Sequence, residues 1–340
     1  MIRALLFFIL AASSSLFSQS LDIYFIDVEG GAATLIVTPQ KESVLIDSGW
    51  RRDDGRDAQR IVEVATREAG LQQIDYLVTT HFHRDHYGGV LRLSQLIPIR
   101  NFLDHGPMAE LKEDPQFPML YTEYLKANRG ERQTLKPGQT IALKQGKVPL
   151  KLTCLAARRQ TLTREGAPNP LCSQSQPAKE DLTDNAASVG LLLRFGDFEF
   201  LDNGDLTWNI ESKLVCPTDV IGNVDAYQVT HHGLSSSNNP VLLRSASPTI
   251  AIVNNGPKKG GQPEVYRLLT SLESLKDIFQ VHRNIESSDQ DNTSPDLIAN
   301  LGPEEGCAGH WIRLSVSPDA STITVTNSRN GVSKSYPVTR

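Results

Sequence analysis

The sequence predicts a layered α/β fold, because strand and helix patterns alternate along the chain in two successive series. Of its 340 residues, 39% are hydrophobic and 21% are charged. That share of apolar residues is enough for a large core and too high for a disordered chain. We find no Pro/Gly-rich linker between the two series. Two similar α/β halves that share one core therefore fit better than two independent domains.

The first series begins with strands and continues with alternating helices and strands. Runs of β-branched, aromatic and aliphatic residues predict the strands, and apolar residues on one face predict the helices. The expected strands are at 22–28, 33–38, 43–47, 74–80 and 99–103, and the expected helices at 55–69, 88–96 and 116–128.

The second series contains a long polar stretch, 156–185, which we interpret as a loop and a candidate lid. Two of its expected strands, listed first below, precede this loop. A final pair of strands is expected within 311–327. The other expected strands are at 139–144, 149–155, 187–195, 197–202, 224–230, 248–254 and 277–282, and the helices at 207–214, 239–245 and 263–274.

The N-terminus has the pattern of a secretion signal. Arg3 precedes a short apolar run, and Ser18 and Ser20 form a small-x-small cleavage pattern. We expect residues 1–20 to be removed near Ser20, leaving one mature domain, 21–340, in the periplasm or outside the cell. The alternatives are a buried strand or an uncleaved anchor. After cleavage we expect no attachment to a membrane.

Charge and cysteine content narrow the class of protein. The net charge of −5 at pH 7 makes long nucleic acid an unfavourable partner, although a small substrate remains open. The chain lacks a GxSxG elbow, a Walker motif and GxGxxG, which argues against a serine hydrolase and a nucleotide-binding protein. Four cysteines allow three pairings or four inert thiols, and none forms a CxxC pair: Cys154, Cys172, Cys216 and Cys307.

The strongest candidate site is the stretch His81-Phe82-His83-Arg84-Asp85-His86, directly after the strand 74–80. Imidazole and carboxylate groups are ligands for zinc, manganese and iron. Sites in α/β proteins form at the carboxyl ends of strands, which is where this stretch lies. The pattern therefore predicts a metal site, against the alternative of a chance His-rich loop.

Several motifs together resemble the metallo-β-lactamase superfamily, and most closely its ComEC-type hydrolase branch. They are HxHxDH at 81–86 with Gly88-Gly89, Ile46-Asp47-Ser48-Gly49, the strand Phe198–Leu201 leading to Gly204-Asp205, and His231-His232-Gly233. The resemblance covers about residues 21–285. It implies a four-layer αββα sandwich.

The resemblance also implies two divalent metal ions, with zinc expected and manganese or iron as alternatives. Their implied ligands are His81 and His83 for metal 1, Asp85 and His86 for metal 2, Asp205 between them, and His231 or His232 to complete a site, with His231 preferred. The family's additional mid-chain histidine has no counterpart before Asp205. His105, His232, Asn185 or water could complete site 1.

The implied activity is hydrolysis by a hydroxide that bridges the two metals, since metal binding lowers the pKa of water toward roughly 7. Asp85 and Asp205 are the expected catalytic carboxylates. We expect phosphodiester-type or other small-molecule substrates. Lactone or β-lactam hydrolysis, and a non-catalytic metal-binding module, are the alternatives. The oligomeric state is open.

The roles of several other polar residues are less specific. Asp47 either accepts a hydrogen bond from a ligand histidine or forms an Asx turn before Gly49. The hydroxyls of 235–237 either meet a phosphate or cap the helix near Asn239. His282 and His310 match no motif, and we expect structural roles for both.

Overall fold

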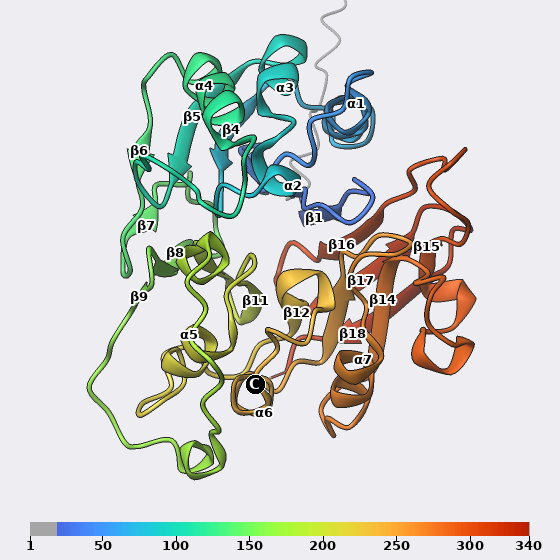
Figure 1. The fold of residues 1–340 in the computed structure, drawn as a ribbon. Coiled ribbons are helices and arrows are strands. Elements are labelled where there is room, and N and C mark those ends of the chain that lie inside the picture. Colours follow the sequence, from blue (N-terminus) through green and yellow to red (C-terminus); the bar gives the residue numbers. More distant parts are fainter. Residues whose placement is uncertain (1–18, 340) are drawn as a thin grey trace, which may run out of the picture.

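The computed structural model describes residues 19–339. Two mixed sheets pack face to face, and helices cover the outer face of each sheet (Figure 1). The N-terminal half supplies most of one sheet with helices α1, α3 and α4, and the C-terminal half supplies the other with α5, α6 and α7. This arrangement confirms the predicted αββα sandwich.

The first sheet is built from both ends of the chain. Its spatial order is β18-β17-β16-β1-β2-β3-β4-β5-β6, and β3 to β6 run parallel. The strands are β1 (Leu21–Phe25), β2 (Thr34–Val37), β3 (Ser43–Ile46), β4 (Ile74–Val78), β5 (Ile99–Asp104), β6 (Gln133–Thr134), β16 (Ile312–Val316), β17 (Thr322–Asn327) and β18 (Ser333–Pro337).

The second sheet has the order β15-β14-β13-β12-β11-β10-β8-β7, with β9 paired to β8 and parallel pairing from β11 to β15. Its strands are β7 (Thr140–Ile141), β8 (Leu150–Ala157), β9 (Gln160–Thr161), β10 (Gly190–Phe195), β11 (Phe198–Asp202), β12 (Ala226–Gln228), β13 (Ile250–Val253), β14 (Asp277–His282) and β15 (Ile298–Asn300).

Three apolar clusters hold the four layers together. The central one joins residues of both sheets, for example Phe25 and Phe200, whose rings meet edge to face. The outer clusters lie between each sheet and its helices. The helices are α1 (Arg56–Glu63), α2 (Arg84–Tyr87), α3 (Val90–Leu96), α4 (Phe117–Ala127), α5 (Trp208–Lys213), α6 (Pro240–Ala246) and α7 (Pro263–Thr270). Burial of one face of each element explains why periodicity alone located most of them.

The structure adds elements that the sequence patterns do not predict. The expected helix at 55–69 ends as an α-helix at Glu63 and continues as a π-helical turn, Val64–Glu68. The stretch 156–185 contains β9 and a 3-10 helix, Pro170–Gln174. The predicted C-terminal hairpin is present as β16 and β17, and β18 extends it. Short strands such as β6 and β15 carry too few residues to show a period.

One disulfide joins Cys172 to Cys216, while Cys154 and Cys307 are free thiols. The pair ties the 3-10 helix Pro170–Gln174 to the segment after α5. The predicted signal segment lies outside the described residues except for its last two positions. Within 19–339, no helix has both the length and the apolar character needed to cross a bilayer.

Candidate metal centre

The predicted metal ligands come together where strands of the two sheets end. His81 to His86 follow β4, Asp205 follows β11, and the pair His231-His232 follows β12. Both histidines of the pair have left-handed backbone angles, with φ of 56° and 55°. This tight turn is fastened to the end of β11, because His231 N donates to Gly204 O over 2.9 Å.

One oxygen atom of Asp205 is the hub of the cluster. Its Oδ2 lies 3.2 Å from His86 Nε2 and 3.4 Å from His231 Nε2. The Nε2 atoms of His232 and His81 follow at 3.5 and 3.9 Å. Four imidazole nitrogens around one buried carboxylate oxygen match the donor set of a metal centre.

Around this hub the side chains fall into two groups. Asp85, His86, Asp205 and His232 each offer one ligand atom within 4.8 Å of the others. On the other side, His81 Nε2 lies 3.0 Å from His83 Nδ1, and His231 Nε2 lies 3.3 Å from the Asn185 amide. The His231-His232 pair therefore serves both groups, one histidine each. This donor set fits two divalent ions, with Asp205 between them.

Burial and charge set the protonation states of the side chains in the centre. Burial would lower the pKa of His86, but the surrounding carboxylates raise it well above its ordinary value, so this imidazole loses a proton when it binds metal. Burial would raise the pKa of Asp205, but His86, His231 and His232 hold that pKa well below its ordinary value. Burial lowers the pKa of His231 to about 4, so its imidazole is neutral at pH 7. Burial, together with His86 and His83, also lowers the pKa of His81. Ionised carboxylates and neutral imidazoles are the forms that bind metals.

Hydrogen bonds behind the cluster orient its histidines. Asp47 Oδ2 lies 2.7 Å from His86 Nδ1, which confirms the predicted role of Asp47 as an acceptor for a ligand histidine. Ser237 Oγ lies 3.0 Å and Ser236 Oγ 3.2 Å from His231 Nδ1. These two hydroxyls are therefore engaged by a ligand histidine, and Asn239 caps α6 through its own side chain.

Asn185 is placed as one of the predicted alternatives requires. Its amide faces His231, and its Oδ1 makes no hydrogen bond to any residue of 19–339. Because the two ends of an amide are assigned from their surroundings, the oxygen can equally face the cluster. Asn185 can therefore complete the group that contains His81 and His83.

His105 does not join the cluster. Its Nε2 lies 3.0 Å from Asp184 Oδ2, and the same oxygen accepts a 2.8 Å hydrogen bond from Phe82 N. His105 thus supports the backbone of the metal-binding loop from behind. Its place at the end of β5 gave no signal that separated this role from that of a ligand.

Two charged residues beside the cluster were not singled out by the sequence. Lys259 Nζ contacts Asp85 Oδ2, and Lys259 also lies over the ring of Trp50. Burial would raise the pKa of Asp85, but Lys259 and His86 outweigh it and hold that pKa well below its ordinary value. Glu113 Oε1 lies 3.5 Å from His83 Nε2. Neither residue belongs to a motif, so only the fold brings them here.

A hollow of about 720 Å³ adjoins the His83 side of the centre. Glu113, which contacts His83, and Asp184, which holds the backbone of Phe82, both line it. Arg158 and Arg159 lie on its wall. Acidic and basic side chains are balanced in this lining, so the hollow itself carries no net charge that selects a ligand.

Comparison with known protein families matches residues 26–171 to the metallo-beta-lactamase superfamily. The match contains the whole His81–His86 stretch. Over these residues the chain is similar to the metallo-beta-lactamase superfamily. This match agrees with the predicted superfamily and supports a metal-dependent hydrolase. A comparison with curated proteins found no match.

Solved structures of similar fold share little sequence with this chain. A metal-dependent hydrolase from Parabacteroides distasonis is 15% identical, with a TM-score of 0.43 over 77% of this chain and 93% of its own. A metallo hydrolase from Ignicoccus hospitalis is 14% identical, with a TM-score of 0.40 over 75% and 94%. CmlA, a diiron beta-hydroxylase from Streptomyces venezuelae, is 16% identical, with a TM-score of 0.39 over 70% of this chain. This chain spans about 45% of the length of CmlA. Likeness at this level carries no argument about activity.

Proposed function

We propose that this protein is an exported binuclear metallo-hydrolase that cleaves phosphodiester-type substrates. The observation that carries the proposal is the convergence of four histidine nitrogens and Asp85 on Asp205. The centre joins residues from both sheets, and its electrostatics keep Asp205 ionised and His231 neutral. Two divalent ions bound here would supply Lewis acidity and lower the pKa of water at the site.

The chain's own residues have distinct parts in this proposal. His81, His83 and His231 would hold one ion, His86, His232 and Asp85 would hold the other, and Asp205 would contribute to both sites. Asp85 stays ionised beside Lys259, so it can accept a proton or orient the attacking water. Asp47 holds the Nδ1–H tautomer of His86 and leaves Nε2 free to bind.

The surroundings of the centre support an anionic substrate. The ammonium group of Lys259 lies beside Asp85. Arg158 and Arg159 line the adjoining hollow, where acidic and basic side chains are equal in number, so Lys259 carries most of this argument. Such cationic groups attract and orient a phosphate. The resemblance of His231-His232-Gly233 to the ComEC-type branch points in the same direction. A carboxylate-bearing lactam would meet the same cations, so it is the alternative outcome of the test.

Export is part of the proposal. The disulfide between Cys172 and Cys216 suits an oxidising compartment, in agreement with the N-terminal signal pattern. Mass spectrometry of exported protein should give a start at or near Leu21. A full-length species retained in membranes would contradict export.

The test is a chromogenic panel on purified mature protein. It compares bis(p-nitrophenyl) phosphate, p-nitrophenylphosphorylcholine, a lactone and a cephalosporin, each with and without chelator. We expect phosphodiester turnover that chelator abolishes. Preference for the lactone or cephalosporin would favour the carbonyl-hydrolase alternative, and no turnover of any substrate would favour a non-catalytic module.

A Lys259→Met variant tests the assignment of the anion-binding group. Removal of the ammonium should raise KM for the charged phosphodiester by about tenfold, which corresponds to one lost charge-assisted hydrogen bond. Turnover of a neutral lactone, where there is any, should change less. The matched control is Lys258→Met, at the exposed neighbouring position.

A further inference from the structure

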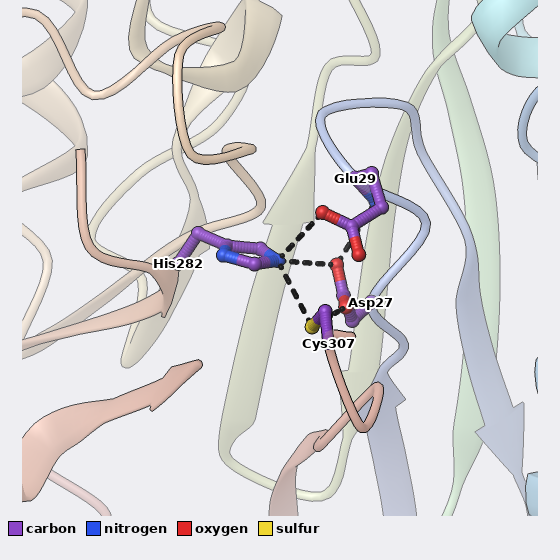
Figure 2. Close-up of side chains that lie close together, drawn as sticks. All are labelled: Asp27, Glu29, His282 and Cys307. Atoms are coloured by element: carbon purple, nitrogen blue, oxygen red, sulfur yellow. Dashed lines mark hydrogen bonds and ion pairs between the residues drawn. The ribbon is translucent and has the colours of Figure 1, made fainter. Parts of the chain in front are cut away.

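A second group of metal-ligand side chains shares no residue with the candidate metal centre. It contains Asp27, Glu29, His282 and Cys307, and one ligand atom from each lies within 4.8 Å of the others. They come from the turn after β1, the end of β14 and the segment between β15 and β16. Figure 2 shows a ring nitrogen of His282 facing both carboxylates and the sulfur atom.

The spacing of these atoms is close to that of a tetrahedral site. His282 Nε2 lies 3.0 Å from Asp27 Oδ1 and 3.1 Å from Glu29 Oε2. Cys307 Sγ lies 3.8 Å from the same nitrogen. It also lies 3.3 Å from Asp27 Oδ2, the oxygen of that carboxylate which faces Arg60. Zinc–ligand bonds of about 2.0–2.3 Å in tetrahedral geometry place neighbouring donors about 3.3–3.6 Å apart.

The group has more acceptors than hydrogen atoms to satisfy them. The single N–H that His282 Nε2 can carry faces two carboxylate oxygens and a sulfur. Apart from its 3.1 Å contact with the shared His282 Nε2, Glu29 Oε2 has no hydrogen-bond partner among the described residues, and the Glu29 side chain is completely buried. A buried carboxylate oxygen without a hydrogen bond is costly unless a cation neutralises it.

Arg60 holds the carboxylates from the opposite side. Its Nη1 lies 2.8 Å from Asp27 Oδ2 and 3.1 Å from Glu29 Oε1. Each carboxylate therefore uses one oxygen for Arg60 and turns the other, Oδ1 or Oε2, toward His282. The inward oxygens are prepositioned as ligands, and the guanidinium prevents them from turning away.

We propose that Asp27, Glu29, His282 and Cys307 bind a zinc ion as a structural site, separate from the candidate catalytic centre. Four protein ligands that include sulfur and imidazole suit zinc and close its coordination sphere, as in other structural zinc sites. Calcium and magnesium prefer all-oxygen sites, so this donor set disfavours them.

Such an ion would brace the turn that supports the catalytic loop. Glu29 has a left-handed backbone, with φ of 55°, which costs energy unless its surroundings hold it. Three residues later, Ala32 N donates a 3.0 Å hydrogen bond to Asp85 O. The turn thus connects the proposed zinc site to a ligand of the candidate catalytic centre.

A proton is the competing occupant of the same place. Burial opposes charge on His282, but hydrogen bonds with Asp27, Cys307 and Glu29 outweigh it and raise the pKa of His282 to about 11. A protonated His282 leaves Cys307 as a free thiol, whereas zinc converts it to a bound thiolate. The state of Cys307 therefore separates the two occupants.

Cobalt substitution reads that state directly. The candidate catalytic centre contains no cysteine. Cys154 lies in the core, where its thiol donates a hydrogen bond to Ala156 O. In mature protein stripped with chelator and reloaded with Co²⁺, a thiolate-to-cobalt absorption band would thus come from Cys307. We expect this band in the wild type, its loss in Cys307→Ser with about one fewer bound ion per chain, and its retention in Cys154→Ser. A cobalt-loaded wild type without the band would overturn the proposal.

Two further measurements keep the test independent of folding and of the proposed activity. Alkylation of Cys307 in the wild type, followed by peptide mass spectrometry, should be at least tenfold slower with Zn²⁺ than after chelation. Equal rates would show an ion-pair network instead of a metal site. Asp205→Asn should keep the cobalt–thiolate band while it loses metal from the other centre, so failure of one site is distinguishable from failure of the other.

Discussion

Asp47 Oδ2 and His86 Nδ1 lie 2.7 Å apart, and both side chains are buried behind the candidate metal centre. Thr80 donates two further hydrogen bonds to the same carboxylate, from its backbone N over 2.8 Å and from its hydroxyl over 2.7 Å. All three partners donate, so only a carboxylate satisfies them. The pair therefore fixes the tautomer in which His86 Nε2 is free to bind metal.

Asp47→Asn should weaken metal binding by about 10–100-fold. The side-chain amide has only one acceptor oxygen, so its N–H₂ group must face a hydrogen-bond donor of Thr80 or His86. Either His86 loses its acceptor or the Thr80 backbone does. Competition with a chromophoric chelator measures the change. Thr66→Val is the control, since Thr66 is exposed and bonds only to its own helix. Unchanged affinity would show that Asp47 only stabilises the turn.

Glu211 in α5 should make the metal-free protein less stable as pH rises. Burial raises the pKa of Glu211 to about 8, and its Oε2 accepts a 2.8 Å hydrogen bond from Asn239 N. Between pH 4.5 and 8 the folded state holds a proton that the unfolded state has lost. Stability is thus fully present below pH 4.5 and falls as pH rises through 8, by up to about 5 kcal/mol.

Glu211→Gln removes this titration, so its free energy of unfolding should match that of the wild type near pH 4.5 and exceed it at pH 9. Urea denaturation of chelator-treated protein at both pH values measures the difference. Glu264→Gln, at an exposed position of α7, is the control and should not differ from the wild type. Parallel pH profiles for wild type and Glu211→Gln would contradict the prediction.

Most ligands of the candidate metal centre were predictable because they lie in short sequence motifs. His81 to His86 are contiguous and follow a strand, and Asp205 and His231-His232 also follow strand patterns. Carboxyl ends of parallel strands gather at one edge of a sheet, which brings Asp205 and His231-His232 together at the ends of β11 and β12. Packing of the two sheets then brings the His81–His86 stretch, at the end of β4, against them. The resemblance to a family then assigned a metal to each group, which the residue pattern alone could not do.

Single residues that lie outside a motif cannot be assigned to the site from the sequence. Lys259 reaches the centre from the segment between β13 and α7, and its role depends on a contact with Asp85, which is distant in the sequence. The same holds for Asp27, Glu29, His282 and Cys307, where His282 was expected to be merely structural. The cysteine pairing was open for this reason too, because it depends on where the long loop packs.

Replacing Cys172 and Cys216 together by serine should lower the free energy of unfolding by up to about 4 kcal/mol. The two cysteines are 44 residues apart in the sequence. Closing a loop of that length lowers the conformational entropy of the unfolded chain, which stabilises the folded state by about this free energy. Hydrogen bonds from Asn169 to Val215 O and Ser245 Oγ remain and will hold the segment in place. Urea denaturation measures the change. Cys154→Ser keeps the disulfide, and an equal loss in that variant would show that the effect does not come from the bond.

Asp205→Asn should lower metal occupancy of the catalytic centre and reduce turnover by about 10²-fold or more, while the fold survives. A carboxylate can offer one oxygen to each of two cations and neutralise both. An amide has the same shape but no charge and only one oxygen. Elemental analysis and turnover of the best substrate in the panel measure the two effects, with circular dichroism as the check on folding.

Asp202→Asn is the matched control, three residues earlier and equally buried. Burial raises the pKa of Asp202 to about 7, so a neutral side chain is already well tolerated there. Its Oδ1 accepts a 2.9 Å hydrogen bond from Gly204 N, which an amide oxygen can also accept. The Asp202 variant should therefore keep most of its metal and activity. If instead Asp205→Asn retains near-normal turnover and metal content, Asp205 does not link the two groups of ligands. The catalytic centre would then have to be rebuilt on Asp85, the remaining carboxylate of the cluster.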